Sequence, residues 1–316
     1  NRRAIFLSVK RMSQSETTHV ESLVIGAGAA GIMAAIASAE RGARGVVLLE
    51  GGDRPARKIL ISGNGRCNLT NLDADQPGHY HSAQPRFARP ALRAHPVEKT
   101  LGFFHDLGVV TRVEKRGRLF PVSDQAQSII DLLVDRLQML NVQLELSARV
   151  EALSAREGGG FDVRCTDGRA WQADSVIVAT GGLSVPKLGA NDSGMCMCEE
   201  FGHQRTALYP GLVPLESEDP HVRRMAGVRV WARVSAEGPG GRRVEDTDDL
   251  LFTRYGLSGF TILNLSGRLV PLLAEGPRDV HISLLPESTP EEAGELLHDR
   301  WQRHPHRSLG LSLAGL

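Results

Sequence analysis

The chain has 316 residues, of which 41% are hydrophobic, and this is enough for about two globular domains with hydrophobic cores of their own. Lys plus Arg and Asp plus Glu both number 37, so the chain lacks the basic excess with which proteins bind nucleic acids or anionic membranes, and we expect neither partner. The four cysteines are too few and too irregularly spaced for a disulfide framework, which favours a reducing, cytoplasmic location.

The N-terminal segment is expected to be a tail ahead of the first domain. Its apolar run at residues 4–9 is shorter than the core of a signal peptide and far shorter than a membrane span. Because the chain begins with Asn1 and Met12 precedes a polar leader, we expect natural translation to start at Met12. The tail is expected to span residues 1–19.

A βαβ unit is predicted after this tail. Residues 22–25 form a short apolar run that ends at Gly26, as expected of a buried parallel strand. An alanine-rich helix is predicted over residues 32–40, and a second strand over residues 46–49 ends at Glu50.

Helical and strand-like patterns alternate through the rest of the first domain. We expect helices over residues 96–107 and 123–140, the second with apolar residues spaced by four. Alternation at residues 142–150 and an Asp-Gly turn signal at residues 167–168 predict further strands. These elements complete a domain that is expected to span residues 20–190.

A second, smaller domain of mixed, β-rich structure is predicted over residues 191–316. Thr289 and Pro290, followed by two glutamates, match the start of a helix. Strands are expected at residues 208–215, 228–236 and 280–285, and a further helix at residues 260–273.

Residues 26–31 read GAGAAG and match the dinucleotide-binding pattern G-x-G-x-x-G between a strand and a helix. Gly26 permits the tight turn, Gly28 lets the backbone approach a pyrophosphate, and Gly31 lets helix and strand pack closely. The phosphates would meet free N–H groups and the positive end of the helix dipole. Glu50 is placed to accept hydrogen bonds from an adenosine ribose. The pattern predicts dinucleotide binding, rather than a glycine turn without a ligand, and does not choose between NAD and FAD.

The passage after Glu50 is extended, basic and glycine-rich, whereas a simple nicotinamide dehydrogenase soon begins another helix there. Arg57 and Lys58 are placed to neutralise phosphate, and residues 62–68 are placed to wrap the middle of a cofactor. This passage favours a ligand longer than NAD.

Six motifs occur in an order that resembles a bacterial flavoprotein family. They read VIGAGAAGIMAA, RKILISGNGRCNLTN, GRLFPVSDQAQSIIDLL, VIVATGGLSVPKLGA, FGHQRTALYPGLVPL and LLFTRYGLSG. From about residue 20 onward, the chain resembles the BaiN/RdsA-like, or YhiN-type, bacterial NAD(P)/FAD-dependent oxidoreductases. The resemblance implies an α/β fold: a Rossmann-like FAD-binding domain of the two-dinucleotide-binding-domain flavoprotein type, with an inserted mixed β-rich domain. The C-terminal part of the FAD-binding domain is expected to be missing, so that the chain ends before its return to that domain.

The resemblance also implies where the cofactor lies. The glycines of residues 26–31 would hold the pyrophosphate, Glu50 the ribose, and residues 62–68 the flavin side. Residues 179–182 would form the crossing beside the cofactor, where small side chains allow close approach, and Val150 would lie near the adenine. The predicted cofactor-binding residues are Gly26, Gly28, Ala29, Ala30, Gly31, Glu50, Arg57, Lys58, Ser62, Gly63, Gly65, Arg66, Cys67, Asn68, Val150, Ala179, Thr180, Gly181 and Gly182.

Individual side chains leave some roles open. Cys67 could modulate a flavin or react with substrate, but no second cysteine is spaced for a redox pair, so we favour packing as a small hydrophobe. Arg66 could contact phosphate or hold the loop by bonding its carbonyl groups. Cys196 and Cys198 lack a second pair of ligands, so no metal is predicted. No catalytic side chain is assigned, because a triad is assembled only by folding.

The function implied by the resemblance is that of an FAD-dependent oxidoreductase. NAD(P)H is expected as a transient electron donor, because a second glycine fingerprint is absent, and a small organic acceptor such as an activated alkene receives the hydride. One alternative is a flavin-dependent oxidase. Another is a non-catalytic or RNA-modification-associated flavoprotein, which the neutral charge disfavours. The sequence assigns no oligomeric state.

Overall fold

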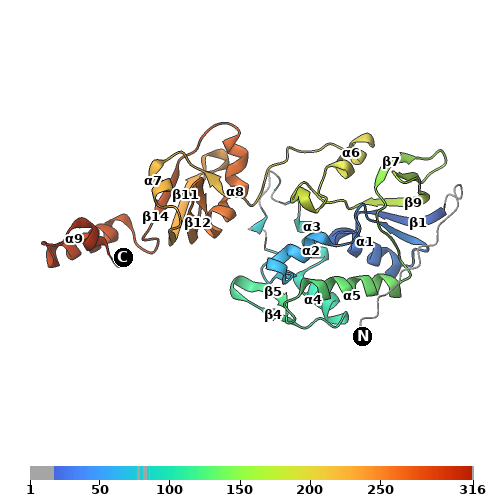
Figure 1. Cartoon of the computed structure of the whole chain (residues 1–316), viewed down its shortest axis with the longest axis horizontal. Helices are drawn as coiled ribbons and strands as arrows, with labels where there is room; N and C mark the ends of the chain where they lie inside the picture. Colours follow the sequence, from blue (N-terminus) through green and yellow to red (C-terminus); the bar gives the residue numbers. More distant parts are fainter. Residues whose placement is uncertain (1–17, 77–78, 81–83, 85, 315–316) are drawn as a thin grey trace. The chain divides into compact units, whose positions relative to one another are not determined.

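The computed structural model describes residues 18–76, 79–80, 84 and 86–314 (Figure 1). It divides into two compact units, the first ending at Arg205 and the second beginning at Thr206, whereas the sequence analysis placed a boundary after residue 190. The expected translation start at Met12 and most of the expected tail lie outside the described residues. The last two residues of that tail already belong to the first strand.

The first unit is built around a mixed sheet. The first unit as a whole contains the strands β1 (Thr18–Ile25), β2 (Val46–Leu49), β3 (Thr70–Asn71), β4 (Thr111–Val113), β5 (Arg118–Pro121), β6 (Gln143–Glu145), β7 (Val150–Ala155), β8 (Phe161–Cys165) and β9 (Ala170–Val178). Its helices are α1 (Ala29–Glu40), α2 (Arg57–Ile61), α3 (Arg89–Ala94), α4 (Val97–Asp106), α5 (Ala126–Met139) and α6 (Ser193–Glu200). A short 3-10 segment, Ser62–Gly65, follows α2 directly.

The main sheet has the strand order β6-β2-β1-β9-β8-β7. β6, β2, β1 and β9 run parallel, and β9, β8 and β7 form an antiparallel meander. Ile25 pairs with both Leu49 and Val178, so β1, β2 and β9 end side by side. The residues that follow these strands therefore meet at one edge of the sheet, where ligands bind in folds of this kind.

Two apolar layers bury the two faces of this sheet. On one face, the side chains of α1 and α5 pack against β1 and β2, as the spacing of apolar residues in α5 predicted. On the other face, side chains of β1 and β2 form a second buried cluster with side chains of β7, β8 and β9 and with Met197 of α6. In the cartoon, α1 and α5 lie beside each other along the parallel strands (Figure 1).

A small sheet with the order β3-β5-β4 lies next to the passage at residues 62–68 in the sequence and in space. The backbone N–H of Leu69 donates to the carbonyl of Leu119, and Thr70 pairs with Leu119 in the antiparallel register. The end of the passage is thus fixed to β5.

The second unit contains a five-stranded antiparallel sheet with the order β10-β13-β12-β11-β14. The strands are β10 (Leu215–Glu216), β11 (Arg229–Glu237), β12 (Arg243–Phe252), β13 (Gly256–Ser258) and β14 (Val280–Ser283). The helices are α7 (Pro220–Arg224), α8 (Phe260–Leu273), α9 (Pro290–Arg303) and α10 (Leu309–Leu313). The apolar face of α8 packs on β11 and β12 and forms the core of this unit.

Some elements of the second unit differ from the sequence prediction. The expected strand at residues 208–215 is present only as the short β10, whereas β12 was not predicted at all. β12 contains acidic residues that mask its alternation, yet Val244, Asp248, Leu250 and Phe252 are all buried with a period of two. The helix at residues 260–273 is confirmed, and α9 begins at Pro290 as predicted.

None of the helices in the described part of the chain is both long enough and apolar enough to cross a membrane.

Candidate functional site

The three glycines of the turn between β1 and α1 serve different physical needs. Gly26 has φ +103°, and a Cβ there would lie 2.7 Å from the carbonyl oxygen of Ala179. A Cβ at Gly31 would lie 1.7 Å from the carbonyl oxygen of Gly26. A Cβ at Gly28 would meet nothing within 4 Å. The fold itself therefore requires glycine at positions 26 and 31, whereas Gly28 preserves open space.

The open space lies at the N-terminus of α1. Gly28 is the N-cap residue and supplies no side-chain cap, and the first turn of α1 contains no acidic residue. Gly28, Ala29 and Ala30 all line a cavity. The uncapped amides and the positive end of the helix dipole therefore face a space that suits a phosphate group.

Glu50 is held at the end of β2 by two backbone groups. Its Oε2 accepts a hydrogen bond from the amide of Ala27 at 3.0 Å, and its Oε1 accepts one from the amide of Gly52 at 2.8 Å. Each carboxylate oxygen has a further lone pair with which it can accept a ribose hydroxyl. The first of these bonds also fixes the carboxylate beside the glycine turn, because Ala27 belongs to that turn.

Two adjoining cavities run along this edge of the sheet. The larger has a volume of about 460 Å³ and the smaller about 110 Å³. Both are lined by Gly26, Glu50, Arg57, Thr180, Leu188 and Gly189. The larger also contacts Ser62, Cys67 and Asn68. The glycine turn, the Glu50 carboxylate and residues of the passage at 62–68 therefore all border the larger of these two cavities, which together form one cleft. The volume of the larger cavity falls within the range of small-molecule sites.

Two cations of α2 line the larger cavity. The Arg57 Nη2 contacts Asp53 Oδ1 at 2.5 Å, and this contact lowers the pKa of the Asp53 carboxyl. The Arg57 Nε is buried without a hydrogen-bond partner. The ammonium of Lys58 lies 3.7 Å from the position that a Cβ on Gly181 would occupy, so Lys58 reaches the crossing segment. Both cations are placed to meet a negatively charged ligand.

Most of the predicted cofactor-binding residues come together at the cleft. Val150 lines the smaller cavity. The predicted residues that line the larger cavity are Gly26, Gly28, Ala29, Ala30, Glu50, Arg57, Lys58, Ser62, Cys67, Asn68, Ala179, Thr180 and Gly181.

Gly31, Gly63, Gly65, Arg66 and Gly182 line neither cavity. Gly31 packs on the glycine turn. A Cβ at Gly63 would lie 2.7 Å from the amide of Asn68, so Gly63 serves the turn. The Arg66 guanidinium is directed to Glu114 at 2.8 Å. These residues shape the walls of the cleft and do not form its surface.

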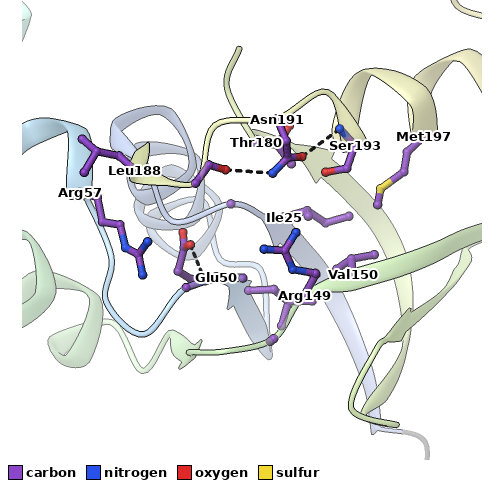
Figure 2. A pocket seen from close by; sticks show the side chains of 16 residues that line it. Ile25, Glu50, Arg57, Arg149, Val150, Thr180, Leu188, Asn191, Ser193 and Met197 are labelled. Atoms are coloured by element: carbon purple, nitrogen blue, oxygen red, sulfur yellow. Dashed lines mark hydrogen bonds between the residues drawn. The ribbon is translucent and has the colours of Figure 1, made fainter. Parts of the chain in front are cut away.

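Several residues that line the cleft were not predicted from the sequence. Arg149 precedes the predicted Val150, and the segment after the crossing supplies Leu188, Gly189, Asn191 and Ser193 (Figure 2). The Asn191 side chain closes a turn by accepting from the Ser193 amide at 3.0 Å and donating to the Gly189 carbonyl at 2.9 Å. The AND tripeptide at residues 190–192 is a typical turn signal that could have drawn attention to this segment.

Apolar side chains that line the larger cavity were also missed. They are Met33, Ala56, Ile59, Leu69, Phe104, Ile129 and Leu133, from α1, α2, α4, α5 and the passage near β3. The predicted spacing by four included Ile129 and Leu133, which are buried, whereas Met33, Ile59, Leu69 and Phe104 are partly buried. Only the packing of α1, α4 and α5 around one space shows that the same side chains also face a ligand cavity.

Cys67 lies in the wall of the larger cavity with a buried side chain and φ +62°. Burial raises the pKa of its thiol, which keeps it protonated at neutral pH. A protonated, buried thiol is consistent with the packing role that the sequence favoured. Within the described residues, no group of three or more His, Cys, Asp or Glu side chains is arranged to hold a metal ion.

The chain matches known proteins over most of its length. Residues 20–261 match the HI0933-like protein Rossmann domain, and residues 209–316 match the HI0933-like protein barrel and H2TH domain. The chain is 37% identical over 297 residues to a 3-dehydro-bile acid delta(4,6)-reductase of Clostridium scindens, which covers 93% of this chain and 71% of that protein. It is 35% identical over 297 residues to a ribosomal RNA dihydrouridine synthase of Escherichia coli, with 93% of this chain and 70% of that protein covered.

Among solved structures, the open conformation of a flavocytochrome c3 fumarate reductase has a TM-score of 0.43 and 19% identity, with 67% of this chain and 47% of that chain covered. The sequence matches confirm the predicted family and its Rossmann fold class. The relative named as a reductase confirms the expected enzyme class of oxidoreductase. The chain belongs to the HI0933-like family, with the Rossmann domain of that family followed by its barrel and H2TH domain.

Proposed function

We propose that the chain binds FAD along the carboxyl edge of its parallel sheet and supplies the cofactor site of a reductase that acts on carbon–carbon double bonds conjugated to a carbonyl group. The observation that carries this proposal is the space at Gly28. Apart from Gly28 and its two chain neighbours, no protein atom lies within 4 Å of a Cβ built there, and the uncapped N-terminus of α1 faces the same cavity. A phosphate group fits both features.

We place the parts of FAD along the cleft in the following order. The amides at residues 28–30 and the cations Arg57 and Lys58 would hold the pyrophosphate. Glu50 would accept the ribose hydroxyls, and the smaller cavity beside Val150 would take the adenine. Ser62, Cys67 and Asn68 would then lie toward the flavin, because they line the larger cavity away from the smaller one.

The protein contributes binding, orientation and charge to the reaction. A bound flavin supplies the hydride chemistry. Around it, the dipole of α1, Arg57 and Lys58 would balance the charge of the diphosphate, and the buried side chains of Ile129 and Leu133 in α5, which line the larger cavity, would keep water from that part of it. We propose NAD(P)H as the electron donor, which would visit the site transiently.

The class of acceptor is proposed from the chemistry that two relatives share by name. A 3-dehydro-bile acid delta(4,6)-reductase acts on double bonds next to an oxo group, and a dihydrouridine synthase saturates the uracil double bond next to a carbonyl. In both acceptors, the carbonyl withdraws electrons and makes the alkene carbon receptive to hydride. The shared requirement is therefore an alkene activated by a carbonyl group.

We place a small molecule first among acceptors of this class. The chain has equal numbers of basic and acidic residues, 37 of each, and an RNA substrate is usually held by a basic surface. A uridine in RNA is the second candidate, because relatives from Escherichia coli and Haemophilus influenzae carry the name of ribosomal RNA dihydrouridine synthase.

The test is to purify the chain, release its bound nucleotide, and identify that nucleotide by chromatography and mass spectrometry. The flavin is then reduced without oxygen by NADH or NADPH, and its reoxidation is followed with an enone steroid, with ribosomal RNA, and with oxygen alone. We expect bound FAD and fastest reoxidation by the enone. A protein that takes up no FAD contradicts the proposal, and reoxidation by oxygen alone at the same rate identifies an oxidase.

A further inference from the structure

We propose that Arg66 is a positioning residue for the flavin end of the cleft. It holds the cofactor loop, which we define as residues 62–68, against β4, β5 and the start of α5, and it contacts no cofactor itself. The inference rests on the proposed binding of FAD and concerns a residue for which the sequence left two roles open, a contact with phosphate or the holding of the loop.

The Arg66 side chain is engaged by neighbouring protein groups and lines neither cavity. Its Nη1 contacts Glu114 Oε1 at 2.8 Å and Asp124 Oδ1 at 3.7 Å. Its guanidinium carbon lies 4.1 Å from the centre of the Phe120 ring, which is buried. Arg66 therefore combines charge pairing with stacking, an arrangement for which a planar guanidinium is suited and an ammonium is not.

The contacts of Arg66 reach three elements. Glu114 follows β4, Phe120 belongs to β5, and Asp124 lies just before α5. Arg66 itself is in the middle of the loop, between the turn at Gly63 and the cavity wall at Asn68. One side chain thus joins the loop to the small sheet and to the segment just before α5, a helix that supplies Ile129 and Leu133 to the larger cavity.

The cofactor loop requires such support because its backbone is strained. Gly63, Asn64, Gly65 and Cys67 all have positive φ, at 56°, 58°, 84° and 62°. Asparagine tolerates this region better than most residues, but cysteine does so rarely. A conformation of this kind persists only where the surrounding structure determines it from several sides. Arg66 lies within this stretch and connects it to Glu114 by an ion pair and to Phe120 by stacking on the ring.

Residues of the strained loop also line the larger cavity. Cys67 and Asn68 line the larger cavity, whereas Arg66 does not. Loss of the Arg66 contacts frees the loop to relax, and the positions of Cys67 and Asn68 change with it. The expected consequence is weaker binding of the flavin end of FAD, with the binding of its ADP end unchanged.

Arg112 offers a matched control. Its Nη2 contacts the same two carboxylates, Glu114 Oε1 at 2.9 Å and Asp124 Oδ2 at 2.7 Å. The side chains of Arg66 and Arg112 are 32% and 38% exposed. Arg112 belongs to β4, so its removal takes one cation from the same cluster without releasing the cofactor loop.

The experiment measures dissociation constants for FAD and for ADP by titration calorimetry with the full chain and its variants. For Arg66→Ala, we expect the Kd for FAD to rise by about 10-fold or more and the Kd for ADP to stay within about twofold. Arg112→Ala should leave both values within about twofold of the wild type. Arg66→Lys should fall between the wild type and Arg66→Ala, because it keeps the charge and loses the stacking and the fork of donors.

Three outcomes overturn the inference. The first is an unchanged FAD affinity in Arg66→Ala, and the second is an equal loss of FAD and ADP affinity, which shows a general defect of the fold. The third is an equal loss of FAD affinity in Arg112→Ala. If Arg66→Ala does not fold, Arg66→Lys decides by its ratio of FAD to ADP affinity. A wild-type chain that binds ADP but not FAD contradicts the proposed function itself and is seen before any variant is made.

Discussion

Position 28 separates the needs of the fold from those of the ligand. The backbone of Gly28 has φ −80° and ψ −174°, which a β-branched residue adopts without strain. We therefore expect Gly28→Val to fold, with a loss of stability of about 1 kcal/mol because valine is a poorer N-cap than glycine, and to lose FAD affinity by about 100-fold, because the side chain fills the space of the diphosphate. Calorimetric titration and thermal unfolding measure the two quantities.

Gly102→Val is the control for that variant. Gly102 lies in α4, a Cβ there also meets nothing within 4 Å, and the residue lines neither cavity. It should bind FAD like the wild type. Equal FAD affinity in Gly28→Val and in the control would show that the diphosphate lies elsewhere.

The cysteines differ in their expected reactivity. The pKa of Cys165 is raised to about 11, mainly by burial of its thiol, and burial also raises the pKa of Cys67. Cys196, in contrast, is exposed. Since only the thiolate reacts, and a raised pKa keeps the thiol protonated, iodoacetamide at about pH 8 should modify Cys196 first. Mass spectrometry of peptides over time measures the order. Early labelling of Cys67 would contradict its packing role.

Helix α9 has a capping box at its N-terminus, which we expect to stabilise the helix. Thr289 accepts a hydrogen bond from the Glu292 amide at 3.2 Å, and the Glu292 side chain accepts one from the Thr289 amide at 2.8 Å. None of the residues that the structure describes within α9 is buried, so packing contributes little to this helix. Thr289→Ala should therefore destabilise α9 by about 1 kcal/mol.

Hydrogen exchange of the amides in residues 290–303 measures that loss, and Thr289→Ser, which keeps the hydroxyl, should restore the protection. Protection that is the same in all three proteins would show that the capping box does not support the helix.

For the chain as a whole, the two units are expected to respond differently to nucleotide. Every residue that lines the two cavities lies in the first unit, which ends at Arg205. A ligand stabilises the part of the protein that binds it, by about 2.7 kcal/mol at a concentration 100 times its Kd. ADP should therefore slow hydrogen exchange in β1, α1 and β2 and leave β11 and β12 unchanged. Equal slowing in both units would contradict a nucleotide site confined to the first.

Local pattern was sufficient for the first βαβ unit, for α5 and for the start of α9. Gly26, Gly28, Gly31 and Glu50 were identified because the glycine turn and the following strand lie close together in the sequence, where spacing has a direct geometric meaning. The parallel strands and α5 followed from apolar runs and from a period of four. Thr289 likewise marked the start of α9, because a capping box acts over three residues.

Only the tertiary structure shows which residues from distant segments of the chain join the cleft. Arg149, Asn191 and Ser193 join the site only because the ends of β1, β2 and β9 align and bring distant segments to one edge. Whether Arg66 faces the cleft or Glu114 depends on contacts between residues 48 positions apart, which no local spacing encodes. Sequence patterns determine which backbone turns and which faces are buried, whereas the direction of a long charged side chain is set by the partners that folding places around it.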